Sequence, residues 1–169
     1  MMTDNEIIQR VREGHTDDFA WLVSRYADRV MAFVGRMVTI REDAEDLVQD
    51  TFLQVYRELH RYDGSRGTFS TWLLHIAYTQ TLMFLRRRKP TMELLDKIAE
   101  EPSEGDDTSE MLRRSVSQLP AEDQTVVHLY YAEDLPLKDI ASVLGHDAAY
   151  WATRLQRIRK KLSEKMKLK

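Results

Sequence analysis

Residues 39–89 read TIREDAEDLVQDTFLQVYRELHRYDGSRGTFSTWLLHIAYTQTLMFLRRRK, and this stretch decides the fold. Its first half has apolar or small residues at the i, i+3, i+4 and i+7 spacing of one buried helical stripe. These residues are Ala44, Leu47, Val48, Thr51, Phe52, Val55, Tyr56 and Leu59. Thr39 and Glu42 have the spacing of a capping box, so we expect the helix to begin at Thr39.

The opposite face of this predicted helix is acidic. Asp46, Gln49 and Asp50 are spaced i, i+3 and i+4, so their side chains should share one surface. Carboxylates near the start of a helix complement its dipole and keep the surface soluble, and spacing alone favours this simple role. A docking face for a partner protein is the alternative interpretation.

A glycine-containing turn separates this helix from a second one. Gly64 and Gly67 permit a tight reversal, and the second helix should begin around residues 68–70. Its core-facing residues are expected to be Phe69, Trp72, Leu73, Ile76, Ala77 and Phe84. The helix ends in four consecutive cations, residues 86–89. Because four cations exceed what a helix end needs, we predict that they bind phosphate.

Two more helices are predicted before this stretch. Thr3 and Glu6 form another capping-box pattern, and Gly14 should end that short helix. A long helix is expected from about Thr16. Its apolar stripe consists of Phe19, Leu22, Val23, Tyr26, Val30, Phe33, Val34 and Met37. Four helices joined by short connections predict an antiparallel bundle over residues 1–90.

Residues 91–112 differ in character from the segments on either side. Positions 91–110 carry eight acidic residues and one cation, whereas residues 1–90 carry 13 of each sign. Residues 100–110 include no apolar residue and contain Pro102 and Gly105. We therefore predict a flexible acidic linker. An inert solubilising loop and a strip that masks the basic helices are the alternative roles.

Residues 113–169 should form a second helical unit that contains a helix-turn-helix. A short helix should end at Gly145, and Asp147 is a good N-cap for the final helix. The inward stripe of that final helix is Trp151, Leu155, Ile158 and Leu162. From residue 154 onward, eight cations accompany one acid. Periodicity alone fits a plain helical hairpin with a basic tail, but the order of these features favours DNA binding.

The composition argues against several classes of protein. No apolar run approaches the ~20 residues that a membrane helix needs, and residues 1–12 carry charges where a signal peptide would be apolar. Without cysteine the chain has no disulfide framework and no thiolate metal site. The histidines lie far apart in the sequence, at His15, His60, His75, His128 and His146. We expect a cytoplasmic protein with no metal, no cofactor and no enzymatic activity.

Several motifs in this order resemble the extracytoplasmic-function sigma factors, the small specificity subunits of bacterial RNA polymerase. The first are DAEDLVQDTFLQVY at residues 43–56, FSTWLLHIA at 69–77 and LRRR at 85–88. The second group consists of Leu119-Pro120, IASVLG at residues 140–145 and RLQRIRKKL at residues 154–162. The resemblance covers nearly the whole chain. It implies two all-α domains, at residues 1–90 and 113–169, joined by the acidic linker.

The resemblance also implies a role for each segment. Asp46, Gln49 and Asp50 would dock on core RNA polymerase. The melted promoter strand would be held by Arg66, Trp72, His75, Thr79, Arg86, Arg87, Arg88 and Lys89. The upstream promoter element would be read by Ala148, Ala149, Tyr150, Thr153, Arg154, Arg157 and Lys161. An anti-sigma protein is a further expected partner, and we expect a monomer when free, without membrane insertion.

Two motifs depart from the pattern of this family. Where the family has Ala-Arg-Asn and a later Asp, this chain has Ala-Tyr-Thr at residues 77–79 and Met83. The final helix begins Ala-Ala-Tyr-Trp-Ala at residues 148–152, with few side chains able to form bidentate contacts to bases. We therefore hypothesise ordinary polymerase binding with unusual or assisted promoter choice. The alternatives are a helix-turn-helix regulator that acts without polymerase docking, and a bundle that sequesters a partner protein.

Overall fold

The computed structural model describes residues 1–88 and 107–167. These residues form two compact units, one on each side of residues 89–106, and each unit is described by itself. Every regular element in the described ranges is helical, so the predicted all-α class is confirmed. None of the described helices is long and apolar enough to cross a membrane.

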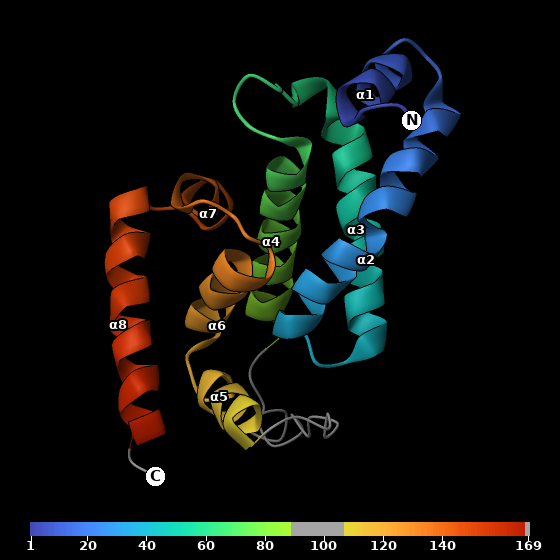
Figure 1. Cartoon of the computed structure of the whole chain (residues 1–169). Helices are drawn as coiled ribbons and strands as arrows, with labels where there is room; N and C mark the ends of the chain where they lie inside the picture. The colour runs from blue at the N-terminus through green and yellow to red at the C-terminus, as the bar shows by residue number, and fades with distance from the viewer. Residues whose placement is uncertain (89–106, 168–169) are drawn as a thin grey trace. The chain divides into compact units, whose positions relative to one another are not determined.

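The N-terminal unit, residues 1–88, is a helical bundle. Its elements are α1 (Asp4–Arg12), η1 (Thr16–Asp18), α2 (Phe19–Met37), α3 (Arg41–Glu58), η2 (Leu59–Arg61) and α4 (Phe69–Arg87). Figure 1 shows α2, α3 and α4 side by side, and each of these three helices contacts the other two. The predicted antiparallel bundle is therefore present, with α1 packed against α2 at its end.

The core of the bundle forms where the apolar stripes of the helices meet. Apolar side chains with 1% or less of their surface exposed are Ile7, Ile8, Leu22, Val30, Phe33, Val34, Ala44, Val55, Leu73, Leu74 and Ala77. Trp21 lies off the stripe of α2 and is 60% exposed. Because the stripes face inward, the acidic side of α3 and one polar side of α4 are left on the surface.

Side-chain caps begin two of these helices. Glu6 N–H donates to Thr3 Oγ1, and the Glu6 carboxylate accepts from Thr3 N–H, so the predicted capping box is confirmed. Thr71 N–H donates to Thr68 Oγ1 at 3.2 Å at the start of α4. Gly14 follows α1 with φ of +106°, a left-handed conformation that favours glycine and ends the helix as expected.

The predicted N-cap of α3 was wrong by one residue. The helix begins at Arg41 with Ile40 as its N-cap, and no side chain caps it. The first helical hydrogen bond runs from Ala44 N–H to Ile40 O at 3.0 Å. Val38 is buried, and Thr39 is exposed one residue before the cap. Thr39 and Glu42 thus have the spacing of a capping box without forming one.

The C-terminal unit, residues 107–167, is also helical. Its elements are α5 (Asp107–Ser117), α6 (Ala121–Val127), η4 (His128–Ala132), α7 (Leu137–Leu144) and α8 (Ala148–Lys167), with η4 a turn of π-helix. Helix α8 packs against α5, α6 and α7 (Figure 1). Trp151 is fully buried, and Leu155 and Ile158 are 2% exposed, so this helix supplies the centre of the core.

The predicted linker was too long at its C-terminal end. Helix α5 already begins at Asp107, so residues 107–112 are helical. The first turn of a helix is often polar because carboxylates there complement the dipole, and the lack of apolar residues was therefore no sign of a loop. Glu110 pairs with Arg113 and Arg114 at 3.5 and 3.2 Å, which supports this first stretch of helix. The remainder of the predicted linker lies outside the described residues.

Candidate docking and nucleic-acid interfaces

The acidic face of α3 is fully on the surface. Asp46, Gln49 and Asp50 are all exposed, whereas most of the opposite stripe of the same helix is buried in the bundle. Of the residues predicted in that stripe, Val48 is only half-buried and Tyr56 is 42% exposed. Neither Asp46 nor Asp50 forms an ion pair with any described residue. Leu53 lies one helical turn beyond Gln49 and Asp50 and is 53% exposed, so an apolar side chain extends the face. A polar surface with an exposed apolar side chain beside it suits contact with another protein.

One face of α4 carries the aromatic and polar side chains predicted to hold a DNA strand. Trp72, His75, Thr79 and Arg86 are spaced by three, four and seven residues, which places them along one line of the helix. Trp72 is half-buried, and its ring centroid lies 5.4 Å from that of Tyr62. His75 and Thr79 are exposed, and the Thr79 hydroxyl donates to His75 O at 2.9 Å.

The basic end of α4 is divided between exposed and paired cations. Arg86 and Arg87 are exposed and have no ion pair to a described residue. Arg88 instead forms an ion pair of 2.7 Å with Asp43 of α3, and its guanidinium lies 5.1 Å from the ring centroid of Phe84. Binding of phosphate by Arg88 would therefore require it to leave Asp43. Lys89, the last cation of the predicted run, lies outside the described residues.

The turn between α7 and α8 has the predicted helix-turn-helix geometry. Gly145 has φ of +91° and His146 has φ of +62°, so two successive left-handed residues reverse the chain. Asp147 Oδ1 accepts from Tyr150 N–H at 2.8 Å, which confirms the predicted N-cap. Trp151 Nε1 donates to Gly145 O at 2.7 Å. Trp151 is thus a core residue that fixes the turn, and it is not available to read bases.

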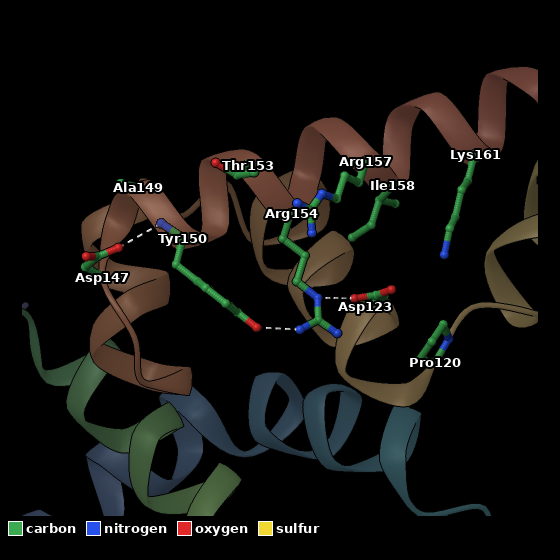
Figure 2. Close-up of a pocket in the computed structure, with 10 residues that line it drawn as sticks. All are labelled: Pro120, Asp123, Asp147, Ala149, Tyr150, Thr153, Arg154, Arg157, Ile158 and Lys161. Carbon is green, nitrogen blue, oxygen red and sulfur yellow. Dashed lines mark hydrogen bonds and ion pairs between the residues drawn. The ribbon is translucent and has the colours of Figure 1, made fainter.

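Arg154 is held inside the C-terminal unit by two carboxylates of α6. Its guanidinium lies 2.5 Å from Asp123 and donates to Tyr150 Oη at 2.6 Å (Figure 2). It also lies 2.8 Å from Glu122. Burial by itself lowers the pKa of Arg154, but these hydrogen bonds and carboxylate charges outweigh burial, so the pKa is raised. The Tyr150 ring in turn stacks on His146, with centroids 3.9 Å apart and planes at 15°.

The exposed side of α8 borders an open hollow of about 720 Å³. Ala149, Thr153, Arg157 and Lys161 are exposed and spaced four residues apart along this side (Figure 2). Tyr150 and Ala148 are only half-exposed at the start of the helix. Of the basic residues predicted to contact upstream DNA, the two without an ion pair to a described residue are therefore Arg157 and Lys161.

Sequence reasoning missed the acidic partners of these cations. Asp43, Glu122 and Asp123 each belong to a different helix from the arginine that they bind. Asp123 and Arg154 are 31 positions apart, far outside the spacings at which helical periodicity reports contact. The pairing becomes evident only in the structure, where Asp123 is 5% exposed and a buried carboxylate needs a partner.

The sequence matches two described families. Sigma-70 region 2 matches residues 22–91, and Sigma-70, region 4 matches residues 109–162. Each match coincides with most of one structural unit, and helix α1 lies outside both. The departures at residues 77–79 and 148–152 therefore fall within the matched segments.

Relatives along the whole length of the chain support the same assignment. The chain is 28% identical to the ECF RNA polymerase sigma factor SigW of Bacillus subtilis, over 95% of each protein. It is 29% identical to the ECF RNA polymerase sigma-E factor of Haemophilus influenzae, over 98% of this chain and 96% of that protein. Its fold is similar to that of the sigma factor RpoE from Bartonella quintana, crystallised with the anti-sigma factor NepR, at a TM-score of 0.70 and 22% identity over 89% of this chain and 97% of the other. The chain therefore belongs to the extracytoplasmic-function sigma factors of bacterial RNA polymerase.

Proposed function

We propose that this sigma factor docks on core RNA polymerase through Asp46, Gln49 and Asp50 of α3. The observation that carries the proposal is the arrangement of α3, which buries one stripe in the bundle and exposes these three side chains together. An exposed carboxylate face without ion pairs to described residues adds nothing to the bundle core. It is available to a partner with basic side chains.

Promoter melting is assigned to α4 and the turn before it. Melting requires a base to leave the stack, and such bases are held by aromatic rings while cations bind the adjoining backbone. Trp72, His75 and Thr79 form the proposed base-holding line, with Arg66 on the neighbouring turn. Arg86 and Arg87 supply the exposed positive charge. Lys89 is proposed to add to it, and Arg88 would do so only on leaving Asp43.

Upstream promoter contact is assigned to α8. Ala148, Ala149, Tyr150 and Thr153 would face base edges in the major groove, and Arg157 and Lys161 would bind phosphate. Alanine offers only apolar contact, and the Tyr150 hydroxyl is already bound by Arg154. Few bidentate base contacts are left, which supports the hypothesis of unusual or assisted promoter choice.

Three further parts of the proposal follow from the family. The protein makes or breaks no covalent bond and is not an enzyme, since its proposed work is binding and strand capture. Its place of action is the cytoplasm, where its proposed polymerase and promoter partners are found. An anti-sigma protein is a second proposed protein partner.

The docking proposal is tested by mixing the purified protein with core RNA polymerase and measuring complex formation. The wild type should bind tightly, and the Asp46→Ala/Gln49→Ala variant should bind at least about tenfold more weakly, a loss of about 1.4 kcal/mol. Asp28→Ala is the matched control, because it removes one exposed carboxylate from α2, away from the proposed face. It should bind like the wild type.

The same experiment separates the rival functions. A wild type that fails to bind polymerase but binds duplex DNA with a steep salt dependence would be a regulator acting through its helix-turn-helix. A wild type that binds neither would share the family fold without the initiation role. Equal loss of binding in Asp28→Ala and the double variant would show that general charge, and not the α3 face, attracts polymerase.

A further inference from the structure

Helix α1 holds the start of the turn that leads into α4. Arg12, in the last turn of α1, donates from Nη2 to Leu59 O at 2.8 Å and to Tyr62 O at 2.5 Å. Leu59 is the C-cap of α3, and its carbonyl also accepts from Tyr62 N–H at 3.2 Å. Tyr62 is the C-cap of η2, at the end of that short helix, where carbonyls lack a helical partner. A cation is favoured at such a helix end, and here a different helix supplies it.

A second contact places α1 against the tip of the same turn. A Cβ built on Gly64 would meet Asn5 Oδ1 and Tyr62 Oη, each at 3.4 Å, so the turn passes close to the side chain of Asn5. The turn is closed internally by Tyr62 Oη, which donates to Gly67 O at 3.1 Å. Helix α1 therefore touches the turn at its beginning and at its tip.

Tyr62 connects this contact to the residues proposed to hold DNA. Its backbone carbonyl is bound by Arg12, and its buried ring lies 5.4 Å from the Trp72 ring and 5.7 Å from the Phe69 ring. A shift of the Tyr62 backbone would therefore move the ring against which Trp72 packs. It would also move the turn that carries Arg66.

We propose that Arg12 is a positioning residue for promoter melting: by binding the carbonyls of Leu59 and Tyr62, it fixes the Tyr62 ring and, through it, Trp72. The inference rests on the proposed function, because it assumes that Trp72 contacts the melted strand. Arg12 lies outside the segment matched to Sigma-70 region 2, so the positioning group comes from a helix beyond that match.

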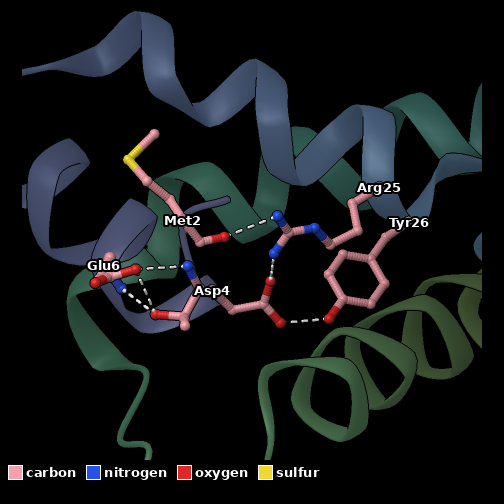
Figure 3. Close-up of polar contacts among 6 residues, drawn as sticks. Met2, Asp4, Glu6, Arg25 and Tyr26 are labelled. Atoms are coloured by element: carbon pink, nitrogen blue, oxygen red, sulfur yellow. Dashed lines mark hydrogen bonds and ion pairs between the residues drawn. The ribbon is translucent and has the colours of Figure 1, made fainter.

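Other contacts keep α1 in place without Arg12. Asp4 accepts hydrogen bonds from both Arg25 and Tyr26 of α2, and Arg25 also donates to Met2 O at 2.9 Å (Figure 3). Ile7 and Ile8 are each 1% exposed and anchor the helix in the core. Loss of the Arg12 guanidinium should therefore disturb the turn and leave the bundle intact.

The test uses the full-length protein assembled with core polymerase, on a promoter selected from a library by the wild-type holoenzyme. Arg12→Ala should slow promoter opening, followed by permanganate reactivity of thymines, by about tenfold, while affinity for core polymerase changes by less than about twofold. Arg12→Lys should restore part of the opening rate, because it keeps a cationic donor but on a shorter side chain than the one that places Nη2 between the two carbonyls. Arg10→Ala is the matched control on the same helix, since Arg10 is exposed and pairs with Asp18. It should open the promoter like the wild type.

Hydrogen exchange distinguishes positioning from loss of structure. In Arg12→Ala, exchange should rise in residues 59–67 and stay unchanged in α1 and α4. Equal promoter opening by Arg12→Ala and the wild type would overturn the inference, as would a rise in exchange across the whole bundle. If the wild type fails to bind core polymerase, the proposed function is wrong and the inference fails with it. If the wild type binds core polymerase and opens DNA, the proposed function holds, and the result for Arg12→Ala tests the role of Arg12 alone.

Discussion

The two units use their basic helices in different ways. In the N-terminal unit α3 and α4 divide the work: α3 exposes an acidic face, and α4 exposes an aromatic and basic line. In the C-terminal unit α8 supplies the centre of the core and also the exposed basic side, whereas α4 shares the core of its bundle with α2 and α3. A residue change on α8 is therefore more prone to affect stability and binding together.

The pairing of arginines shows the same contrast in detail. Arg88 at the end of α4 pairs with one carboxylate, and its side chain is 45% exposed. Arg154 in the middle of α8 pairs with two carboxylates, one of them on Asp123, whose side chain is 8% exposed. The first is a surface ion pair of small expected energy, and the second ties the DNA-facing helix to α6. The number of cations in a basic stretch of sequence is therefore larger than the number that are available to bind DNA.

The largest expected effect tests whether the two units are energetically separate. Trp151→Ala should destabilise the C-terminal unit by about 3–5 kcal/mol, because it leaves a large cavity and removes the hydrogen bond to Gly145 O. Hydrogen exchange of the full chain should show lost protection in residues 107–167 only. Trp21→Ala is the control, since Trp21 is 60% exposed, and it should change neither unit measurably. Lost protection in both units of Trp151→Ala would show that they fold as one.

A smaller effect separates the two roles of α8. Arg154→Ala should destabilise the C-terminal unit by about 1–3 kcal/mol, because the poorly exposed Asp123 carboxylate loses its charged partner. Arg157→Ala should change stability by less than about 0.5 kcal/mol, because Arg157 is exposed and has no ion pair to a described residue.

In DNA binding, Arg157→Ala should have the larger effect and Arg154→Ala the smaller, the reverse of their expected effects on stability. Arg157→Ala should weaken binding to duplex DNA and reduce the slope of log affinity against log salt by about 1. Arg154→Ala should leave that slope unchanged at temperatures where the unit is folded. The measurement is fluorescence anisotropy over a salt series, with denaturant unfolding in parallel. A reduced salt slope in Arg154→Ala would show that Arg154 leaves its carboxylates to bind phosphate.

Sequence periodicity was sufficient to predict the fold, because each stripe is a local pattern. The residues expected inward on α8, from Trp151 through Ile158, are buried, and the turn at Gly145 and Asp147 forms as predicted. The acidic face of α3 was also predictable, since three exposed polar residues share one helical face. These features depend on neighbours within about two helical turns.

What the sequence did not reveal are contacts between distant segments. The carboxylates around Arg154 and the Arg12 contact with the turn before α4 join positions 31 to 50 residues apart. Helical periodicity relates only residues a few positions apart, so it gives no information on contacts across such sequence separations. They decide which cations remain free and which side chains are held in place, so the proposed sites could be named from sequence but not their state of pairing.

The smallest expected effect tests local capping, where the same sequence pattern gave two different outcomes. Thr3→Ala should weaken the start of α1 by about 1 kcal/mol, because the hydroxyl accepts from Glu6 N–H. Thr39→Ala should have no measurable effect, since Thr39 lies outside α3 and caps nothing. The measurement is NMR hydrogen exchange of the first-turn amides of α1 and α3. A loss of protection at α3 in Thr39→Ala would show that the second capping box forms in solution.

The pH dependence of this cap provides a second readout of the same prediction. Hydrogen bonds from the Thr3 N–H and then from the Thr3 hydroxyl lower the pKa of Glu6 below its ordinary value. A carboxyl group with a lowered pKa stabilises the folded state above its ordinary pKa, and this contribution is lost as the pH falls through the lowered value. In Thr3→Ala the Glu6 pKa should move back toward its ordinary value, as followed by NMR titration of the side chain. An unchanged pKa would assign the shift to the backbone N–H alone, because that donor remains in the variant.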